Sequence, residues 1–192
     1  AYKVFQERGL EHASLSELAR KIILQRLLHK GEKEFSVLQT AARQPNFADT
    51  AGRFLWECRS FCVTPEALRQ AAEAVPSPTL SHKLEDISRL YEAYQAFLAD
   101  HFGSADDTMT LLAREIGHYS FLQGAHVWVD GFQWFTPQQM EILRQIERAA
   151  SKVTITLTID EAHLAQQLRE TALFHRAYEV YRDIKTLFPH ME

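Results

Sequence analysis

The chain has 192 residues, 46% of them apolar and 24% charged, with a formal net charge of −4. This is the composition of an ordinary globular protein with a hydrophobic core. The pI near 6.2 argues against a protein that binds nucleic acid over its whole surface, but leaves room for a local basic face. No apolar run approaches the roughly 18 residues of a membrane span, and no signal peptide opens the chain. The two cysteines give no disulfide framework and favour an intracellular location.

Helical patterns fill the first half of the chain. The chain opens at Ala1 rather than Met, already in a helical pattern, so we expect a segment of a longer protein. Ser14, with Glu17 three residues later, predicts a capping box and a helix that runs to about His29. Two more helices are expected over 34–43 and 46–61, because apolar residues recur there at helical spacing.

Two further helices have clear start signals. Thr64-Pro65-Glu66 combines a capping hydroxyl, a proline at the first helical position and an acid in the first turn. Pro76-Ser77-Pro78 is a connector, and an amphipathic helix follows it. Its expected apolar stripe comprises Leu80, Leu84, Ile87, Tyr91, Tyr94 and Leu98. Another helix is expected over 106–116.

The pattern changes after Ala125. Val127–Val129 is a short β-type run, Thr136-Pro137 starts a helix, and Lys152–Ile159 alternates threonine with branched apolar residues. Two strands joined by a helix should be parallel neighbours. Because two strands make no stable open sheet, residues outside this chain or another copy should complete it. A last helix is expected over 173–187.

The first of these strands ends at Asp130, where phosphate-handling α/β folds place a carboxylate that holds Mg²⁺. Superfamily 1 helicases carry Asp-Glu-x-Gln at the equivalent point. Asp130 and Gln133 fit that pattern, but Gly131 replaces the glutamate that would polarise water. Asp130-Gly131 can equally be read as a turn that ends a strand.

Other elements of a nucleotide site are missing from the sequence. None of the seven glycines belongs to the phosphate-binding pattern G-x-x-x-x-G-K-[ST]. The loop therefore lies before Ala1 in the parent protein, or no nucleotide site exists. Asp160-Glu161 follows the second strand, where such helicases place a sensor, but it can also be a solvated acidic loop.

The remaining candidates for chemistry are weaker. Cys58 and Cys62, four residues apart, could share a metal only with further ligands, and buried thiols on an apolar face are the simpler interpretation. The histidines and serines form no recognised catalytic motif, so we assign no catalytic residue and no metal ligand.

The first long helix is basic and could touch phosphates, although a solvated helix face explains the same pattern. The candidate DNA contacts are Arg20, Lys21, Arg26, Lys30 and Lys33.

Nearly the whole chain resembles one protein family. The resemblance is carried by VWVDGFQWFTPQQMEIL with KVTITLTID, by RGLEHASLSELA, by EFSVLQTAARQPNFADTAGRFLWECRSFCVTPEAL and by ALFHRAYEVYRDIK. These segments are similar to the B subunits of AddAB helicase–nucleases, which are also called ATP-dependent deoxyribonucleases. The chain would be an internal fragment of the helicase-like half.

The resemblance implies a mostly α fold with a small parallel βαβ portion, as part of a P-loop NTPase or superfamily 1 helicase-like fold. Residues 1–122 would be a helical insertion of the 1B type, 125–160 the βαβ part of the core, and 161–192 a helical tail that returns to it. Asp130 would be a degenerate motif II aspartate, and Asp106-Asp107 would lie on the preceding helix.

The resemblance also implies a function. The family resects DNA double-strand breaks for homologous recombination in the bacterial cytoplasm, as a heterodimer with an A subunit on double- and single-stranded DNA. ATP, Mg²⁺ and a [4Fe–4S] cluster belong to the parent protein, and no cofactor is assigned to this fragment. We expect a non-catalytic scaffold or DNA-path module. The alternatives are an ATP-binding motor site that uses Asp130 and a stand-alone helical interaction module.

Overall fold

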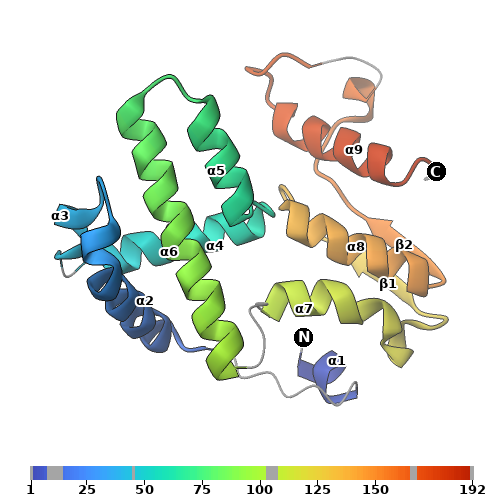
Figure 1. The fold of residues 1–192 in the computed structure, drawn as a ribbon. Coiled ribbons are helices and arrows are strands. Elements are labelled where there is room, and N and C mark those ends of the chain that lie inside the picture. Colours follow the sequence, from blue (N-terminus) through green and yellow to red (C-terminus); the bar gives the residue numbers. More distant parts are fainter. Residues whose placement is uncertain (1, 8–14, 45, 103–107, 165–167, 191–192) are drawn as a thin grey trace. The chain divides into compact units, whose positions relative to one another are not determined.

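A computed structural model describes residues 2–7, 15–44, 46–102, 108–164 and 168–190 (Figure 1). These residues are mostly helical and contain one two-stranded parallel sheet, which confirms the expected mostly α fold with a small parallel βαβ portion. The chain divides into a helical unit, residues 11–111, and a sheet unit, residues 1–10 with 112–192. No helix within the described ranges is long and apolar enough to cross a membrane.

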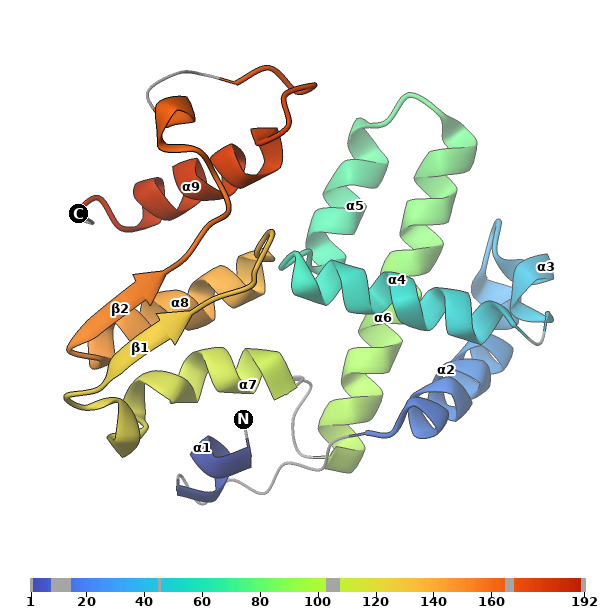
Figure 2. The same cartoon turned by 180° about the vertical axis from the view of Figure 1, so that it is seen from behind.

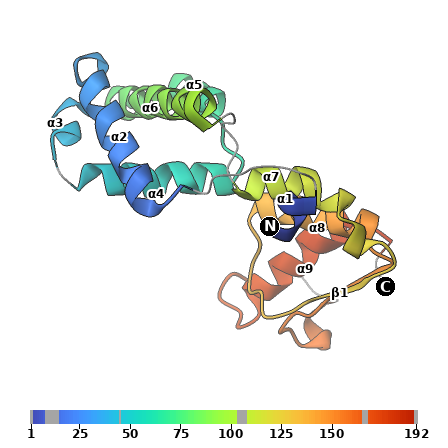
Figure 3. The same cartoon turned by 90° about the horizontal axis from the view of Figure 1, so that it is seen from below.

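The helical unit is built around one hydrophobic core. Its elements are α2 (Glu17–Gly31), the 3-10 helix η1 (Glu32–Glu34), α3 (Gln39–Ala42), α4 (Phe47–Ser60), α5 (Pro65–Ala74) and α6 (Pro78–Phe102). Helices α5 and α6 form a hairpin, and α2 packs against α4 and α6 (Figures 1 and 3). Leu24 and Leu28 from α2, Leu55 from α4 and Tyr94 from α6 are buried in this core. Leu80 is 43% exposed, so the expected stripe of α6 joins the core only from Leu84 onward, with Leu84 and Ile87 partly buried and Tyr91, Tyr94 and Leu98 buried.

The helix starts follow local capping chemistry. Thr64 accepts a hydrogen bond from the Ala67 N–H at 3.2 Å, which confirms the start of α5. For α2 the cap is Ser16, which accepts from the Ala19 N–H at 3.1 Å. The expected cap Ser14 lies outside the described residues.

The expectation of one helix over 34–43 is wrong. Phe35–Leu38 form a loop between η1 and α3, and this loop is held by a residue distant in sequence. The carboxylate of Asp86, which is fully buried on α6, accepts the N–H groups of Ser36, Val37 and Leu38 at 3.0, 2.7 and 3.0 Å. These bonds satisfy both the buried charge and backbone donors that a helix would otherwise have paired.

The sheet unit surrounds the two strands. Its elements are α1 (Tyr2–Glu7), the end of α7 (Thr108–Glu115), the 3-10 helices η2 (Ile116–His118) and η3 (Ser120–Leu122), β1 (His126–Val129), α8 (Pro137–Ala149), β2 (Lys152–Ile155), the 3-10 helix η4 (Glu161–His163) and α9 (His175–Leu187). Glu7 at the end of α1 accepts a hydrogen bond from the Ser120 N–H at 2.8 Å. The predicted pair Asp106-Asp107 lies outside the described residues.

The strands are parallel neighbours, as predicted, and pair from His126 with Lys152 to Val129 with Ile155. Figure 2 shows them side by side with α8 along one face. Val129 and Ile155 pack there with Leu143 of α8 and Ile184 of α9. The second strand is shorter than expected, because β1 offers only four residues to pair with.

Candidate functional site

Asp130 directly follows β1, at the carboxyl end of the sheet. Its carboxylate accepts a hydrogen bond from the Thr156 hydroxyl, just beyond β2. The next residue, Gly131, has a φ of +78°, a left-handed conformation that favours glycine. A Cβ at Gly131 would meet no atom within 4 Å, so the backbone conformation and not space explains the glycine. The residue after Asp130 therefore belongs to a turn and provides no second carboxylate.

Gln133, the other residue of the motif II pattern, lies in the loop between β1 and α8 and is exposed. No hydrogen bond joins Gln133 to Asp130 in the described part of the chain. The end of the loop is fixed at α8, where Thr136 and Gln139 form a reciprocal capping box of 2.9 and 3.2 Å. The structure thus brings Asp130 together with Thr156 rather than with Gln133.

Aromatic side chains gather on and after β1, and sequence reasoning did not single them out. Trp128 is 65% exposed, and its ring lies 4.6 Å from that of His126. Phe132 and Trp134 are 44% and 46% exposed, and Phe132 stacks on Phe135 at 5.0 Å. The run FQWF directly after Asp130-Gly131 was the available signal. Large exposed aromatics are typical of surfaces that meet another molecule.

Asp160 lies in the segment that follows β2, directly before η4. Its carboxylate accepts a hydrogen bond from the Ala162 N–H at 3.0 Å, and its carbonyl accepts one from the His163 N–H at 2.9 Å. Asp160 therefore caps the 3-10 helix η4. This is the geometry of a local turn, as in the simpler of the two interpretations of Asp160-Glu161.

The five basic residues predicted as DNA contacts do not share one surface. Arg20 and Lys21 line a groove between α2 and α4, whereas Arg26 and Lys30 line a groove between α2 and α6. Lys33 is exposed in η1. Lys21 forms an ion pair with Asp49 of α4 at 2.6 Å, so its charge is already compensated.

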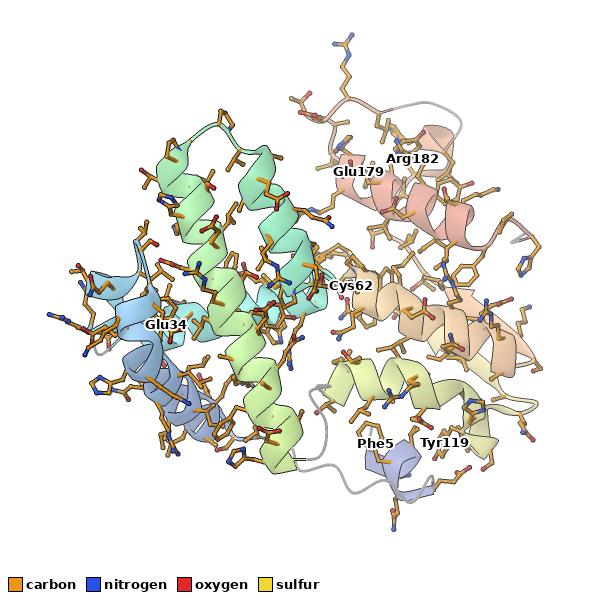
Figure 4. All side chains as sticks on the ribbon, viewed as in Figure 1. Phe5, Glu34, Cys62, Tyr119, Glu179 and Arg182 are labelled. Carbon is orange, nitrogen blue, oxygen red and sulfur yellow. The ribbon has the colours of Figure 1, made fainter. Side chains whose placement is uncertain are left out.

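Cys58 and Cys62 have different environments. Cys58 is buried, as expected, and its burial together with the neighbouring Glu57 charge raises the pKa of its thiol. Cys62 is exposed, so the expectation that it is buried is wrong. It lies past the end of α4 with a φ of +56° (Figure 4). Across the described ranges, no three His, Cys, Asp or Glu side chains are grouped so that they could hold a metal ion.

Comparison of the sequence with known proteins shows which family the chain belongs to. The sequence model of the family described as ADDB, N-terminal, matches residues 1–191. The B subunit of the ATP-dependent helicase/deoxyribonuclease of Pelotomaculum thermopropionicum is 38% identical over 186 residues, which cover 94% of this chain and 16% of that protein. The B subunits of the same enzyme from Desulforamulus reducens and Bacillus subtilis are each 32% identical over 188 residues, covering 96% and 94% of this chain and 16% of each relative.

The chain thus spans about a sixth of the length of these curated relatives. The matched residues include both strands, α8 and the helices of the helical unit. The chain belongs to the family of the amino-terminal region of the B subunits of ATP-dependent helicase/deoxyribonucleases.

Proposed function

We propose that this chain is a non-catalytic scaffold and DNA-path module of a helicase–nuclease subunit. The proposal rests on the structure at the end of β1. There the Asp130 carboxylate accepts a hydrogen bond from the Thr156 hydroxyl, and Gly131 follows in a left-handed turn. Glycine has no group that can activate a water molecule. The strand end has the position of a motif II but not the pair of acids that hydrolysis requires.

The proposed fold context is a superfamily 1 helicase-like core. In this proposal 1–122 is mainly a helical insertion of the 1B type, 125–160 is part of the α/β core, and 161–192 returns to it. Two general rules support this placement. Parallel strands joined by a helix follow a right-handed crossover, and two strands alone need further neighbouring strands to form a stable sheet. The chain would then contribute one part of a sheet that the longer subunit completes.

The residues of this chain do not fit the cofactors of the proposed parent protein. An ATP–Mg²⁺ site needs a phosphate-binding loop, and the sequence has none. A [4Fe–4S] cluster is held by four cysteines, and this chain has two, of which Cys58 is buried and Cys62 exposed. The residues of this chain alone therefore provide no complete set of ligands for ATP–Mg²⁺ or for a cluster.

The proposed partners are the A subunit of the same helicase–nuclease and DNA, both double- and single-stranded. The relatives are named as one lettered subunit of a helicase/deoxyribonuclease, which supports a multi-subunit enzyme that acts on DNA. The biological setting we propose is resection of double-strand breaks for recombinational repair in the bacterial cytoplasm.

The DNA part of the proposal is tested by neutralising the basic residues of α2 and η1 in the full-length subunit, assembled with its partner subunit. The variant carries Arg20→Gln, Lys21→Gln, Arg26→Gln, Lys30→Gln and Lys33→Gln. We expect weaker DNA binding and a shallower dependence of affinity on salt, because each lost phosphate contact lowers the salt slope by about one unit. Unchanged affinity, slope and DNA processing would refute a DNA path along this helix.

A further inference from the structure

The groove between α2 and α4 has a volume of about 460 Å³. Its floor is apolar and narrow, since Ala48 and Gly52 let the backbone of α4 approach Leu24 of α2. A Cβ added at Gly52 would lie 3.1 Å from the Leu24 Cδ1 atom. Figure 3 shows the two helices lying against each other. The volume is at the small end of the range for ligand pockets, roughly 300–1,000 Å³, so the groove suits a group of one or two rings.

Trp56 forms one wall of this groove. It is 55% exposed, although tryptophan is usually largely buried. Its position on α4 is set by helix geometry, because Gly52 lies one turn earlier on the same face of the helix and both residues line the groove. The ring is therefore an accessible flat surface held by a regular helix rather than by a loop.

Two arginines line the same groove as Trp56. Arg20 of α2 and Arg53 of α4 both line the groove, and in the part of the chain that the structure describes neither side chain makes an ion pair or a hydrogen bond. Lys21 also lines it, but Asp49 pairs with Lys21 at 2.6 Å. Glu17 is the remaining acid at the rim. The lining thus has three cations and two acids, and two of the cations are arginines, which pair well with phosphate.

We propose that this groove binds single-stranded nucleic acid, with one base stacked on Trp56 and the adjacent phosphates on Arg20 and Arg53. Aromatic stacking combined with a cationic rim is the chemistry by which proteins hold single strands without reading their sequence. A duplex fits less well, because its bases are stacked on one another and are not free to stack on an indole. The inference rests on the proposed DNA path and names its contact surface.

The groove on the other side of α2 provides an internal comparison. It contains Arg26, Lys30 and Arg89, so it has a similar number of cations. Its aromatic residues are Phe35, which is buried, and Phe97 and His101, which stack on each other at 4.0 Å. This second groove therefore has positive charge but no exposed indole on which a base could stack. Substitutions on the two sides of the same helix separate groove binding from general electrostatic attraction.

The test uses the full-length subunit assembled with its partner subunit and a fluorescent oligothymidylate of about ten nucleotides, within the usual site size for single strands. The variants are Trp56→Leu, Trp56→Phe and the pair Arg20→Gln/Arg53→Gln. The matched control is Arg26→Gln/Lys30→Gln, which removes the same charge from the other groove. In parallel, an oligonucleotide with 5-iodouracil is photocrosslinked to the wild-type complex, and the crosslinked peptide is identified by mass spectrometry.

We expect a crosslink within α4 and a loss of affinity of about tenfold or more in Trp56→Leu, because a stacked base contributes that much to binding. Trp56→Phe should retain most of the affinity. The arginine pair should weaken binding more than the control pair. Amide hydrogen exchange of α2 and α4 should not change, because Trp56, Arg20 and Arg53 lie at the surface of the groove.

Three results would overturn the inference. Equal losses from both arginine pairs, with none from Trp56→Leu, would indicate diffuse electrostatics and leave the proposed DNA path intact. Unchanged single-strand binding without an α4 crosslink would place the DNA contact elsewhere. Failure of Trp56→Leu to assemble with the partner subunit would make the groove a protein interface. The proposed function itself fails only in two cases. The first is that the wild-type complex binds no DNA. The second is that replacing all five basic residues of α2 and η1 changes neither DNA affinity nor its salt dependence nor DNA processing.

Discussion

The hydroxyl of Thr156 donates a hydrogen bond to the carboxylate of Asp130 and joins the residues that follow the two strands. A backbone hydrogen bond joins the same two segments, because the Thr156 N–H donates to the Val129 carbonyl at 3.0 Å. In a parallel pair, alternate residues share one face of the sheet. Asp130 and Thr156 therefore extend the face that carries Trp128 and Thr154. The aspartate thus has a structural partner directly after the neighbouring strand.

This bond predicts that Thr156→Val loosens the carboxyl end of the sheet. Valine has the shape of threonine but cannot donate, so the Asp130 carboxylate loses its partner, at a cost of about 1 kcal/mol. Amide exchange of the residues around Val129 and Ile155 should become faster in the intact subunit. Thr158→Val is the control, since Thr158 is exposed two residues further on. Equal exchange in both variants would show that the bond contributes nothing.

The buried carboxylate of Asp86 should be far more important for stability. Asp86→Ala leaves the N–H groups of Ser36, Val37 and Leu38 without their acceptor in a site that is partly buried at Ser36 and Val37 and buried at Leu38, and we expect a loss of about 3 kcal/mol. Hydrogen exchange at residues 36–38, measured in the intact subunit, should rise by orders of magnitude. Asp100→Ala, an exposed acid on the same helix, should leave this loop unchanged. Slow exchange at 36–38 in Asp86→Ala would contradict the anchoring role.

The two thiols should differ in reactivity. The thiolate is the reactive form, and burial raises the pKa of Cys58, so Cys58 stays protonated and shielded near neutral pH. Cys62 is exposed. Brief treatment of the native protein with iodoacetamide should therefore label Cys62 and spare Cys58, as read by peptide mass spectrometry. Raising the pH should label Cys58 only after the pH passes its raised pKa or the protein unfolds. Equal early labelling of both would disprove this assignment.

Much of the fold could be predicted from the sequence, wherever local chemistry determines the structure. Thr64-Pro65 and Thr136-Pro137 start α5 and α8 because a capping hydroxyl satisfies free N–H groups within the same few residues. The order of strand, helix and strand in 125–160 likewise predicted a parallel pair. These features depend on neighbours close in sequence or on a general topological rule.

The features that the sequence did not predict depend on distant partners. The 35–38 loop looks helical until Asp86, about fifty residues later, takes its N–H groups. The second strand ends early because its partner β1 has only four residues. For the candidate site, the position of Asp130 was predicted, but its bond to Thr156 was not. The division of the basic residues of α2 between two grooves also depends on where α4 and α6 pack.

We propose that the end of β1 is not a working nucleotide site. Its most direct test is ATP binding by the intact subunit carrying Asp130→Ala or Asp130→Asn, together with ATP turnover and DNA unwinding by its complex with the partner subunit. Asparagine keeps an acceptor for Thr156 while removing the charge, and so separates folding from chemistry. We predict that Asp130→Asn leaves ATP affinity, turnover and unwinding at wild-type values, and that any effect of Asp130→Ala is confined to stability. A loss of ATP turnover by orders of magnitude in Asp130→Asn, with the fold intact, would contradict the account and identify Asp130 as a metal-binding acid of an active motor.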